Sequence, residues 1–300
     1  MTKFYHGEKR RSFYFEGWYL KHQTRSGYCL ALIPAVHIDH EGRRSASLQI
    51  ITSDRTWWLE YPETEFEVST RRFHIRMGQN SFSEKGVRLH LEQNDLTLHG
   101  TLLYGPFAPL KSDIMGPFRF LPGMECAHGV ISMCHTLSGT LTLNGESLDF
   151  TGGIGYIETD RGRSFPRAYL WTQSTWQESH CGSLMLSIAT IPTAMGCFTG
   201  CICAISHEGL EYRMATYRGV RIERWLEDGA VIRQGKYRLE VEALEVQCRP
   251  LKAPVEGTMG RIIHESVCSK VRYRFRDGDR LLFDRTDNCA GFEFSDTRKG

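Results

Sequence analysis

Residues 135–152 read HTLSGTLTLNGESLDFTG, and apolar and polar residues alternate on both sides of the step Asn144-Gly145. A period of two is typical of a β-strand with one buried face. Asn-Gly is the step that a tight type I′ turn prefers, because both central residues of that turn need positive φ. Residues 274–283, RFRDGDRLLF, repeat the arrangement around Asp277-Gly278. Both segments therefore predict antiparallel β-hairpins.

The same alternation recurs along most of the chain, and no helical period of comparable length competes with it. The alternating segments end in Gly, Asn or Asp, as strands commonly do. Examples are GYCLALIPAVHI at 27–38, SASLQIIT at 45–52 and YRLEVEALEVQC at 237–248. Many short strands at this spacing predict an all-β protein built as a barrel or a sandwich.

A proline-rich segment interrupts the strand pattern near the middle of the chain. Residues 105–126, GPFAPLKSDIMGPFRFLPGMEC, hold four prolines and predict an irregular connection, since proline lacks the backbone donor that regular elements use. With the hairpin that follows, it suggests a division near residue 150. The expected organisation is an N-terminal β domain over 1–150 and a C-terminal β domain over 151–300.

Charge and cysteine content restrict the partners and the compartment. The 37 Lys and Arg balance 35 Asp and Glu in mixed order, so no field is expected that would recruit nucleic acid or an anionic membrane. Residues 1–22 carry charges and aromatics instead of the apolar run of a secretory signal, which predicts a cytoplasmic protein. The ten cysteines are scattered, and we expect free thiols rather than disulfides.

Residues 181–206, CGSLMLSIATIPTAMGCFTGCICAIS, contain no charged residue and are long enough to span a bilayer. Pro192 and several glycines make them a poor helix and a good pair of strands around a turn. We therefore expect two buried strands and no transmembrane segment. A transient contact with a membrane surface and the oligomeric state stay open at this point.

Two groups of residue types suggest metal ligands. Residues 197–203 contain C-x3-C-x-C, and His37, Asp39 and His40 lie close together. No matching second pair of Cys or His lies near the three cysteines, so they are better explained as residues in the core of a strand. His37, Asp39 and His40 are better explained as residues of a solvated turn. Neither G-x-S-x-G nor a phosphate-binding glycine loop occurs. We expect no metal and no cofactor.

Two other segments place polar residues among apolar or aromatic ones. In FYFEGWYLKHQ at 13–23, Glu16 precedes Trp18 and Tyr19, and Gly17 permits a bulge or a close backbone approach. These residues are interpreted either as an ordinary strand end or as one wall of a binding site.

The second segment is MECAHGVISMCHTLSG at 124–139, where Glu125, His128 and His135 interrupt an apolar run. A buried polar side chain needs a partner or a purpose, so each of the three is either a satisfied core residue or a functional one.

The segment TGGIGYIETDRGRSFPRAYLWTQS at 151–174 brings acids and aromatics together. Alternation places Tyr156, Glu158 and Asp160 on one face of a strand, and Tyr169, Trp171 and Gln173 on one face of the next. A carboxyl group beside aromatic side chains resists ionisation, and the charge on one acid opposes ionisation of a second. One of the two carboxyls can thus stay protonated near neutral pH and act as a general acid.

Several of these blocks resemble the tocopherol cyclase family, in its bacterial branch. The blocks are YFEGWYLKH at 14–22, the long segment at 124–174, EYRMATYRGVRIE at 211–223, GTMGRIIHESV at 257–267 and NCAGFEF at 288–294. The resemblance implies a fold related to the lipocalin-like carotenoid hydratases, with two calycin-type β-barrel or sandwich domains packed together. It also implies acid-catalysed ring closure of a prenylated hydroquinone to a chromanol, without a metal or redox cofactor.

The resemblance also implies roles for single residues. Asp160 is the first choice of proton donor and Glu158 the second, and His128 joins them as a catalytic residue. Arg161 replaces the tryptophan usual before the glycine of this motif. The residues implied as substrate-binding are Glu16, Trp18, Tyr19, Glu125, Tyr156, Arg163, Phe165, Trp171 and Gln173. Trp18 would close the pocket from the other domain, against Trp171.

Three functions fit these expectations, and all take a hydrophobic small-molecule ligand such as a prenylated aromatic or an isoprenoid. The first is the cyclase. The second is a carrier or sensor that uses the same cavity without chemistry, which lipocalin-like folds also support. The third is a hydratase, or another acid-catalysed or pericyclic rearrangement of a polyene. Because hydration adds the mass of water and cyclisation is isomeric, product mass separates the first from hydration.

Overall fold

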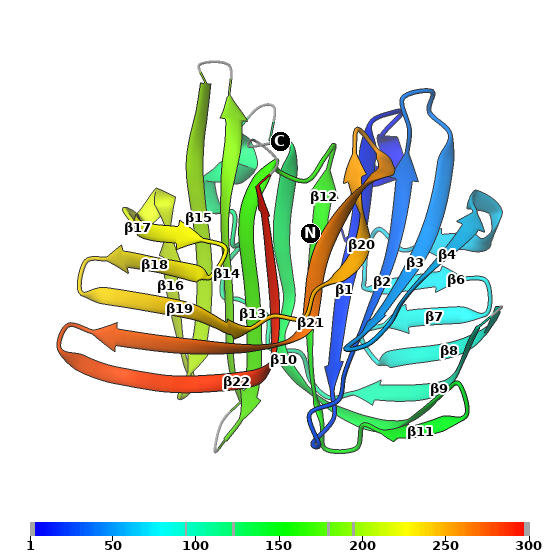
Figure 1. The fold of residues 1–300 in the computed structure, drawn as a ribbon. Helices are drawn as coiled ribbons and strands as arrows, with labels where there is room; N and C mark the ends of the chain where they lie inside the picture. Colours follow the sequence, from blue (N-terminus) through cyan, green and yellow to red (C-terminus); the bar gives the residue numbers. More distant parts are fainter. Residues whose placement is uncertain (1–3, 94, 122–123, 179–180, 194–195, 297–300) are drawn as a thin grey trace.

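The computed structural model describes residues 4–93, 95–121, 124–178, 181–193 and 196–296. Within these ranges the chain forms antiparallel strands and no α-helix. The strands build one sheet of twelve and one of ten, which lie side by side in Figure 1. Among the described residues, four short 3₁₀ helices occur in the connections: η1 (Gly7–Lys9), η2 (Glu63–Glu65), η3 (Gly116–Phe120) and η4 (Thr216–Arg218). The all-β prediction is confirmed.

The first sheet has the order β4-β3-β2-β1-β12-β10-β9-β8-β7-β6-β5, with β11 paired to β10. Its strands are β1 (Tyr14–Gln23), β2 (Cys29–Ile38), β3 (Arg44–Thr52), β4 (Thr56–Pro62), β5 (Phe66–Val68), β6 (His74–Met77), β7 (Asn80–Ser83), β8 (Gly86–Gln93), β9 (Leu96–Tyr104), β10 (Cys126–Leu143), β11 (Glu146–Asp149) and β12 (Ile154–Gly162). The first and last strands of this set, β1 and β12, pair with each other, so that Gly17 lies opposite Asp160.

The second sheet has the order β16-β15-β14-β13-β22-β21-β19-β18-β17, with β20 paired to β21. Its strands are β13 (Ala168–Gln177), β14 (Cys181–Thr193), β15 (Gly196–His207), β16 (Leu210–Ala215), β17 (Arg221–Leu226), β18 (Gly229–Gln234), β19 (Tyr237–Glu245), β20 (Arg249–Val255), β21 (Thr258–Asp277) and β22 (Arg280–Asp296). Here too a strand from the start of the set, β13, pairs with the last, β22.

The chain passes from one sheet to the other at residues 163–167, whereas the sequence placed the division at residue 150. Strand β12 lies between these positions, and it pairs with β1 and β10 of the first sheet. The proline-rich connection between β9 and β10 is irregular apart from η3, as expected. In sequence order, β12 is the last strand of the first sheet and β13 is the first strand of the second sheet. The crossing segment 163–167 therefore lies next to the ends of both strands.

The two predicted hairpins are present, with different turns. Asn144 and Gly145 both have positive φ, as a type I′ turn requires. In the other hairpin Asp277 pairs with Arg280, so the central residues are Gly278 and Asp279, one position later than expected. Of these two only Gly278 has positive φ, which fits a type II′ turn instead of type I′.

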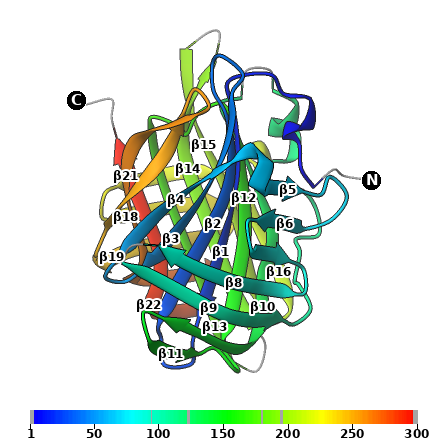
Figure 2. The ribbon, with the colours of Figure 1, turned by 90° about the vertical axis from the view of Figure 1, so that its right-hand side faces the viewer.

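Three hydrophobic clusters fill the molecule: one inside each curved sheet and one between the sheets. Strand β1 contributes to two of them because successive side chains point to opposite faces. Trp18 is fully buried in the cluster of the first sheet, where its ring stacks on Phe4 at 5.5 Å. Tyr19 faces the second sheet. Figure 2 shows the strands of the second sheet behind those of the first.

The charge-free segment forms β14 and β15, which pair directly, so the expected pair of strands is confirmed. The turn residues 194–195 lie outside the described part of the chain. Among the described residues, no helix has the length and apolar character needed to cross a membrane.

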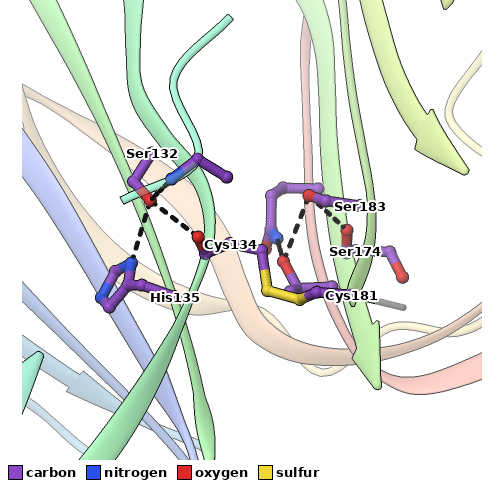
Figure 3. The surroundings of a disulfide bond; sticks show 9 residues. Ser132, Cys134, His135, Ser174, Cys181 and Ser183 are labelled. Atoms are coloured by element: carbon purple, nitrogen blue, oxygen red, sulfur yellow. Dashed lines mark hydrogen bonds between the residues drawn. A yellow bond between two sulfur atoms is a disulfide. The ribbon is translucent and has the colours of Figure 1, made fainter. Parts of the chain in front are cut away.

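A disulfide joins the two sheets, which corrects the expectation that all cysteines are free thiols. Cys134 of β10 is bonded to Cys181 of β14, with their Cα atoms 6.5 Å apart (Figure 3). Cys134 and Cys181 have a sequence separation of 47, and only the packing of β10 against β14 brings these two together. The other eight cysteines are free.

Candidate active site

A cavity lies between the two sheets, and both contribute to its wall. The first sheet supplies residues of β1, β2, β3, β10 and β12, and the second supplies residues of β13, β14, β15, β20, β21 and β22. Met115 and Phe118 of the proline-rich connection and Phe165 and Pro166 of the crossing between the sheets complete the wall. Arg213 fixes this connection to the second sheet, since its guanidinium donates to the backbone oxygens of Ser112 and Asp113 at 2.9 and 2.8 Å.

Aromatic rings form much of the wall. Tyr19 meets Trp171 edge-on at 5.4 Å, across the boundary between the sheets. Phe165, from the crossing between the sheets, packs against Phe15 at 5.5 Å and Tyr169 at 6.1 Å. The π faces of such rings attract positive charge, so the wall suits a cationic species as well as an apolar ligand.

His128 lies between two carboxylates on the wall of the first sheet. Its Nδ1 is 3.0 Å from Asp160 Oδ1, and its Nε2 is 3.3 Å from Glu158 Oε2. The strand register explains this arrangement, because His128 of β10 pairs directly with Asp160 of β12 and Glu158 points to the same face two residues earlier. Burial alone lowers the pKa of His128, but the charges of Glu158 and Asp160 raise it to about 10. The imidazole is thus a cation near neutral pH.

Two further groups hold Glu158 in place. The Tyr156 hydroxyl donates to Glu158 Oε2 at 2.5 Å, and Trp171 Nε1 donates to the same oxygen at 3.3 Å. The predicted proximity of Tyr156, Glu158 and Asp160 on one face of β12 is present in the structure. Tyr156 stands behind Glu158 and is not part of the cavity wall.

A second pair of acids faces this group from the other sheet. Glu265 of β21 and Glu293 of β22 lie directly opposite each other in the sheet, and both line the cavity. Tyr169 donates its hydroxyl hydrogen to Glu293 Oε1. Burial, together with the charge of Glu158, raises the pKa of Glu265 to about 8. Burial and the neighbouring Glu265 raise the pKa of Glu293 well above its ordinary value.

Four polar atoms of residues that line the cavity meet no partner at hydrogen-bond geometry in the described part of the protein: Tyr19 Oη, His37 Nδ1, His128 Nε2, which has only the ion-pair contact with Glu158 at 3.3 Å, and Glu265 Oε1. Buried polar atoms are almost always paired with protein or water, since an unpaired one costs about 1–3 kcal/mol. Their clustering at one cavity indicates groups that bond to a ligand or to ordered water. The two acid groups and these atoms make the cavity a candidate active site.

The titration of Glu265 predicts how stability depends on pH. A carboxyl whose pKa is raised from 4.5 to about 8 on folding stabilises the protein fully below about pH 4.5, and this contribution disappears as the pH rises to about 8. We expect the melting temperature of the wild type to fall between about pH 5 and 9, measured by differential scanning calorimetry. Glu265→Gln keeps the size of the side chain without the charge, so its melting temperature should fall less over the same pH range. An equal decrease in both proteins would contradict the raised pKa of Glu265.

Half of the twelve residues predicted for the site line the cavity. Asp160, Glu158, His128, Tyr19, Phe165 and Trp171 line it. Gly17 also lines it, with regular pairing to β2 and β12 and no bulge.

Glu16 and Trp18 lie on the opposite face of β1, away from the cavity. Glu16 is fully buried and accepts hydrogen bonds from Tyr14 at 2.7 Å and from the backbone and ring of His6 at 2.8 and 2.9 Å. It anchors the N-terminal segment. The predicted contact of Trp18 with Trp171 is made by Tyr19 instead, because a shift of one residue along a strand changes the face.

Three other predicted residues also lie outside the cavity wall. Arg163 is exposed, and its guanidinium pairs with Glu256 at 2.5 Å. Glu125 contributes a backbone oxygen, which accepts from the Arg163 amide at 2.7 Å. Gln173 is buried beyond Trp171 on β13, where its amide nitrogen donates to Thr175 at 2.5 Å.

His135 is a core residue. Its Nδ1 is 3.1 Å from Ser132 Oγ, and its ring packs on Tyr104 and Phe107. Burial lowers the pKa of His135 to about 3, so the ring is neutral.

Glu265 and Glu293 were not among the site residues predicted from the sequence. Glu265 alternates with Ile263 and Val267, which are both buried, so its position in the strand already indicated an acid facing the interior. Glu293 occurs in NCAGFEF, one of the blocks that carried the family resemblance. The two acids were overlooked, since their proximity depends on the pairing of β21 with β22, which the sequence does not reveal.

The residues considered as metal ligands lie at three places. Cys201 and Cys203 are buried in the core of the second sheet, as expected. Asp39 accepts backbone bonds from Glu41 and Arg43 in a turn. His37 was expected in a solvated turn, and this expectation is wrong. The side chain is buried and lines the cavity, and its Nε2 lies 2.8 Å from Ser47 Oγ.

His128, Glu158 and Asp160 offer three ligand atoms within 4.8 Å of one another, as does the more exposed set of His90, Glu92 and His99 on the first sheet. In the cavity these atoms already face one another as an imidazolium between two carboxylates, which accounts for their proximity.

No family model and no curated protein sequence matches this chain. Solved structures share its fold over nearly the whole length. A protein from Nitrosomonas europaea that carries the provisional name AttH is 13% identical with a TM-score of 0.54, covering 93% of this chain and 92% of its own. CghA in complex with Sch210972 is 11% identical with a TM-score of 0.58, covering 94% and 89%. Kievitone hydratase from Nectria haematococca is 9% identical with a TM-score of 0.50, covering 94% and 89%. The shared fold is lipocalin-like.

Proposed function

We propose that this chain is an enzyme that protonates a carbon–carbon double bond of a hydrophobic substrate between the two sheets and directs the resulting cation to ring closure. One observation carries the proposal: a pair of buried acids, Glu265 and Glu293, faces the ionic group of His128, Glu158 and Asp160 across an aromatic cavity. An acid that is still protonated at neutral pH can donate, and an ionised one can accept.

The roles follow from the environment of each carboxyl. Glu265 is protonated near neutral pH although the nearby Tyr19 hydroxyl lowers its pKa, and its Oε1 meets no partner at hydrogen-bond geometry among the described residues, so it is the proposed donor to the alkene carbon. Sequence reasoning favoured Asp160 for this step. Asp160 lies 3.0 Å from the His128 cation, and we assign it the role of base.

In the proposed reaction the Glu265 proton adds to the alkene and leaves a tertiary cation. A hydroxyl oxygen of the same substrate attacks the cation, its proton passes to Asp160, and the product is an isomer of the substrate. The rings of Trp171 and Tyr19 face the cavity, where they can stabilise the cation and keep water away from it. A prenylated hydroquinone, the substrate class implied by the resemblance to the tocopherol cyclases, has the required alkene and hydroxyl.

Capture of the same cation by water would make the chain a polyene hydratase. The kievitone hydratase among the structural neighbours favours this second candidate. Mass spectrometry of products from a panel of prenylated hydroquinones and polyenes decides: an isomer supports the cyclase, and a gain of one water supports the hydratase. If bound compounds are released unchanged, the chain is a carrier.

Filling the cavity should weaken ligand binding without unfolding the protein. A Cβ at Gly17 would meet only Ala35 Cβ at 3.4 Å and Pro34 O at 3.9 Å, so the backbone accepts a side chain there. We expect Gly17→Leu to weaken binding of the hydrophobic fluorophore N-phenyl-1-naphthylamine at least tenfold in a fluorescence titration. Gly17→Ala is the matched control and should bind almost like the wild type. Equal affinity of all three proteins would show that the probe, and the proposed substrate site, lie elsewhere.

A further inference from the structure

Three free cysteines converge outside the cavity, at the boundary between the sheets. Cys29 belongs to β2, Cys268 to β21 and Cys289 to β22, and their sulfur atoms all lie within 4.8 Å of one another. None of the three lines the cavity or takes part in the disulfide. The convergence depends on the pairing of β21 with β22 and on the packing of β2 against β21.

The three sulfurs form a cluster in which two cysteines are buried and one is partly exposed. Cys29 and Cys289 are 1% and 6% exposed, whereas Cys268 is only half-buried. Cys289 Sγ lies 3.2 Å from the backbone oxygen of Gly27, and Cys29 Sγ lies 3.8 Å from it. An ion can therefore reach the sulfurs from the side of Cys268.

The surroundings supply a positive charge from Lys21 and a negative charge from Asp287, whose carboxylate accepts from the Cys289 amide at 2.8 Å and acts on the Cys289 thiol. Lys21 is buried, its ammonium donates to the backbone oxygen of Cys289, and its charge acts on Cys29 and Cys268. Three thiolates with a divalent ion carry a net charge of −1, and with a monovalent ion −2. A buried ammonium offsets one negative charge in either case.

The geometry points to a site that binds one thiophilic metal ion, Zn²⁺ or Cu⁺, through the sulfurs of Cys29, Cys268 and Cys289. Metal–sulfur bonds of about 2.3 Å place the sulfurs of such a site about 3.8 Å apart, so the trio needs to contract by at most about 1 Å. Soft thiolate ligands select Zn²⁺ and Cu⁺ over hard cations. Binding displaces the remaining thiol protons to solvent and involves no change of oxidation state.

The test is a competition titration under anaerobic conditions, with Zn²⁺ against a chromophoric zinc chelator and, separately, Cu⁺ against bicinchoninate. We expect one ion per chain for at least one of the two metals, and an affinity at least 100-fold lower in Cys268→Ser. Cys197→Ser removes an exposed cysteine that is distant in the fold from the trio and is the matched control, expected to bind like the wild type.

A second measurement does not depend on the variants. The preferred metal should protect Cys29, Cys268 and Cys289 from alkylation by iodoacetamide, as mapped by peptide mass spectrometry, and leave Cys197 reactive. The proposal is overturned if neither metal binds stoichiometrically, if Cys197→Ser loses as much affinity as Cys268→Ser, or if two of the three sulfurs are found as a disulfide in the freshly purified protein.

Discussion

Glu265→Gln is expected to lower kcat by about 10²–10⁴-fold, the usual contribution of a positioned general acid, while binding of N-phenyl-1-naphthylamine is retained. The amide has the size of the carboxyl and cannot donate a proton to an alkene. The measurement is single-turnover product formation from whichever member of the prenylated hydroquinone or polyene panel the wild type converts. Wild-type turnover should also fall as the pH rises through about 8, because Glu265 then loses its proton.

Asp160→Asn distinguishes Glu265 as the proton donor from Asp160, the donor that the sequence favoured. If Asp160 accepts the hydroxyl proton, the variant is slow but still loses activity as the pH rises, at a somewhat lower pH than the wild type, since Glu265 is intact but no longer feels the Asp160 charge that raises its pKa. If Asp160 is the donor instead, Asp160→Asn is inactive and Glu265→Gln turns over nearly as fast as the wild type. That second pattern would falsify the role given to Glu265 and leave the cavity as the site.

The strands and hairpins could be predicted because their signals are local. Alternation and the steps Asn144-Gly145 and Asp277-Gly278 are readable within ten residues. The partners of strands far apart in the sequence could not be read in this way. β1 pairs with β12, and β13 pairs with β22, although the paired residues are more than 100 positions apart in the sequence. Because β12 pairs with β1, it belongs to the first sheet and not to the C-terminal part expected from the sequence.

The candidate site shows the same limit. Glu158 and Asp160 were found because they stand two residues apart on one strand, and Phe165 and Trp171 follow shortly after. Glu265 comes from a strand about 100 residues later and reaches the cavity only through the packing of the sheets. Trp18 was assigned to the wall in place of Tyr19 because the amino-acid types alone do not tell which face of β1 points to which core.

Removing the disulfide between Cys134 and Cys181 should lower the free energy of unfolding by about 4 kcal/mol. The bond closes a loop with a sequence separation of 47, and the chain-entropy relation gives this magnitude for a loop of that length. For a large domain, each kcal/mol shifts the melting temperature by about 2–4 °C, so the expected decrease is about 10 °C. Differential scanning calorimetry of Cys134→Ala without reductant measures it.

A double-mutant cycle distinguishes the stabilisation by the Cys134–Cys181 disulfide from the stabilisation by packing of the two side chains. Either single variant, Cys134→Ala or Cys181→Ala, removes the whole bond, so the double variant should be little less stable than each single one. Additive losses would mean that the two sulfurs act independently and that no bond forms between them. Strand β10 carries His128 and β14 carries Ala189, both on the cavity wall, so a bond between these strands also holds the two walls of the cavity together.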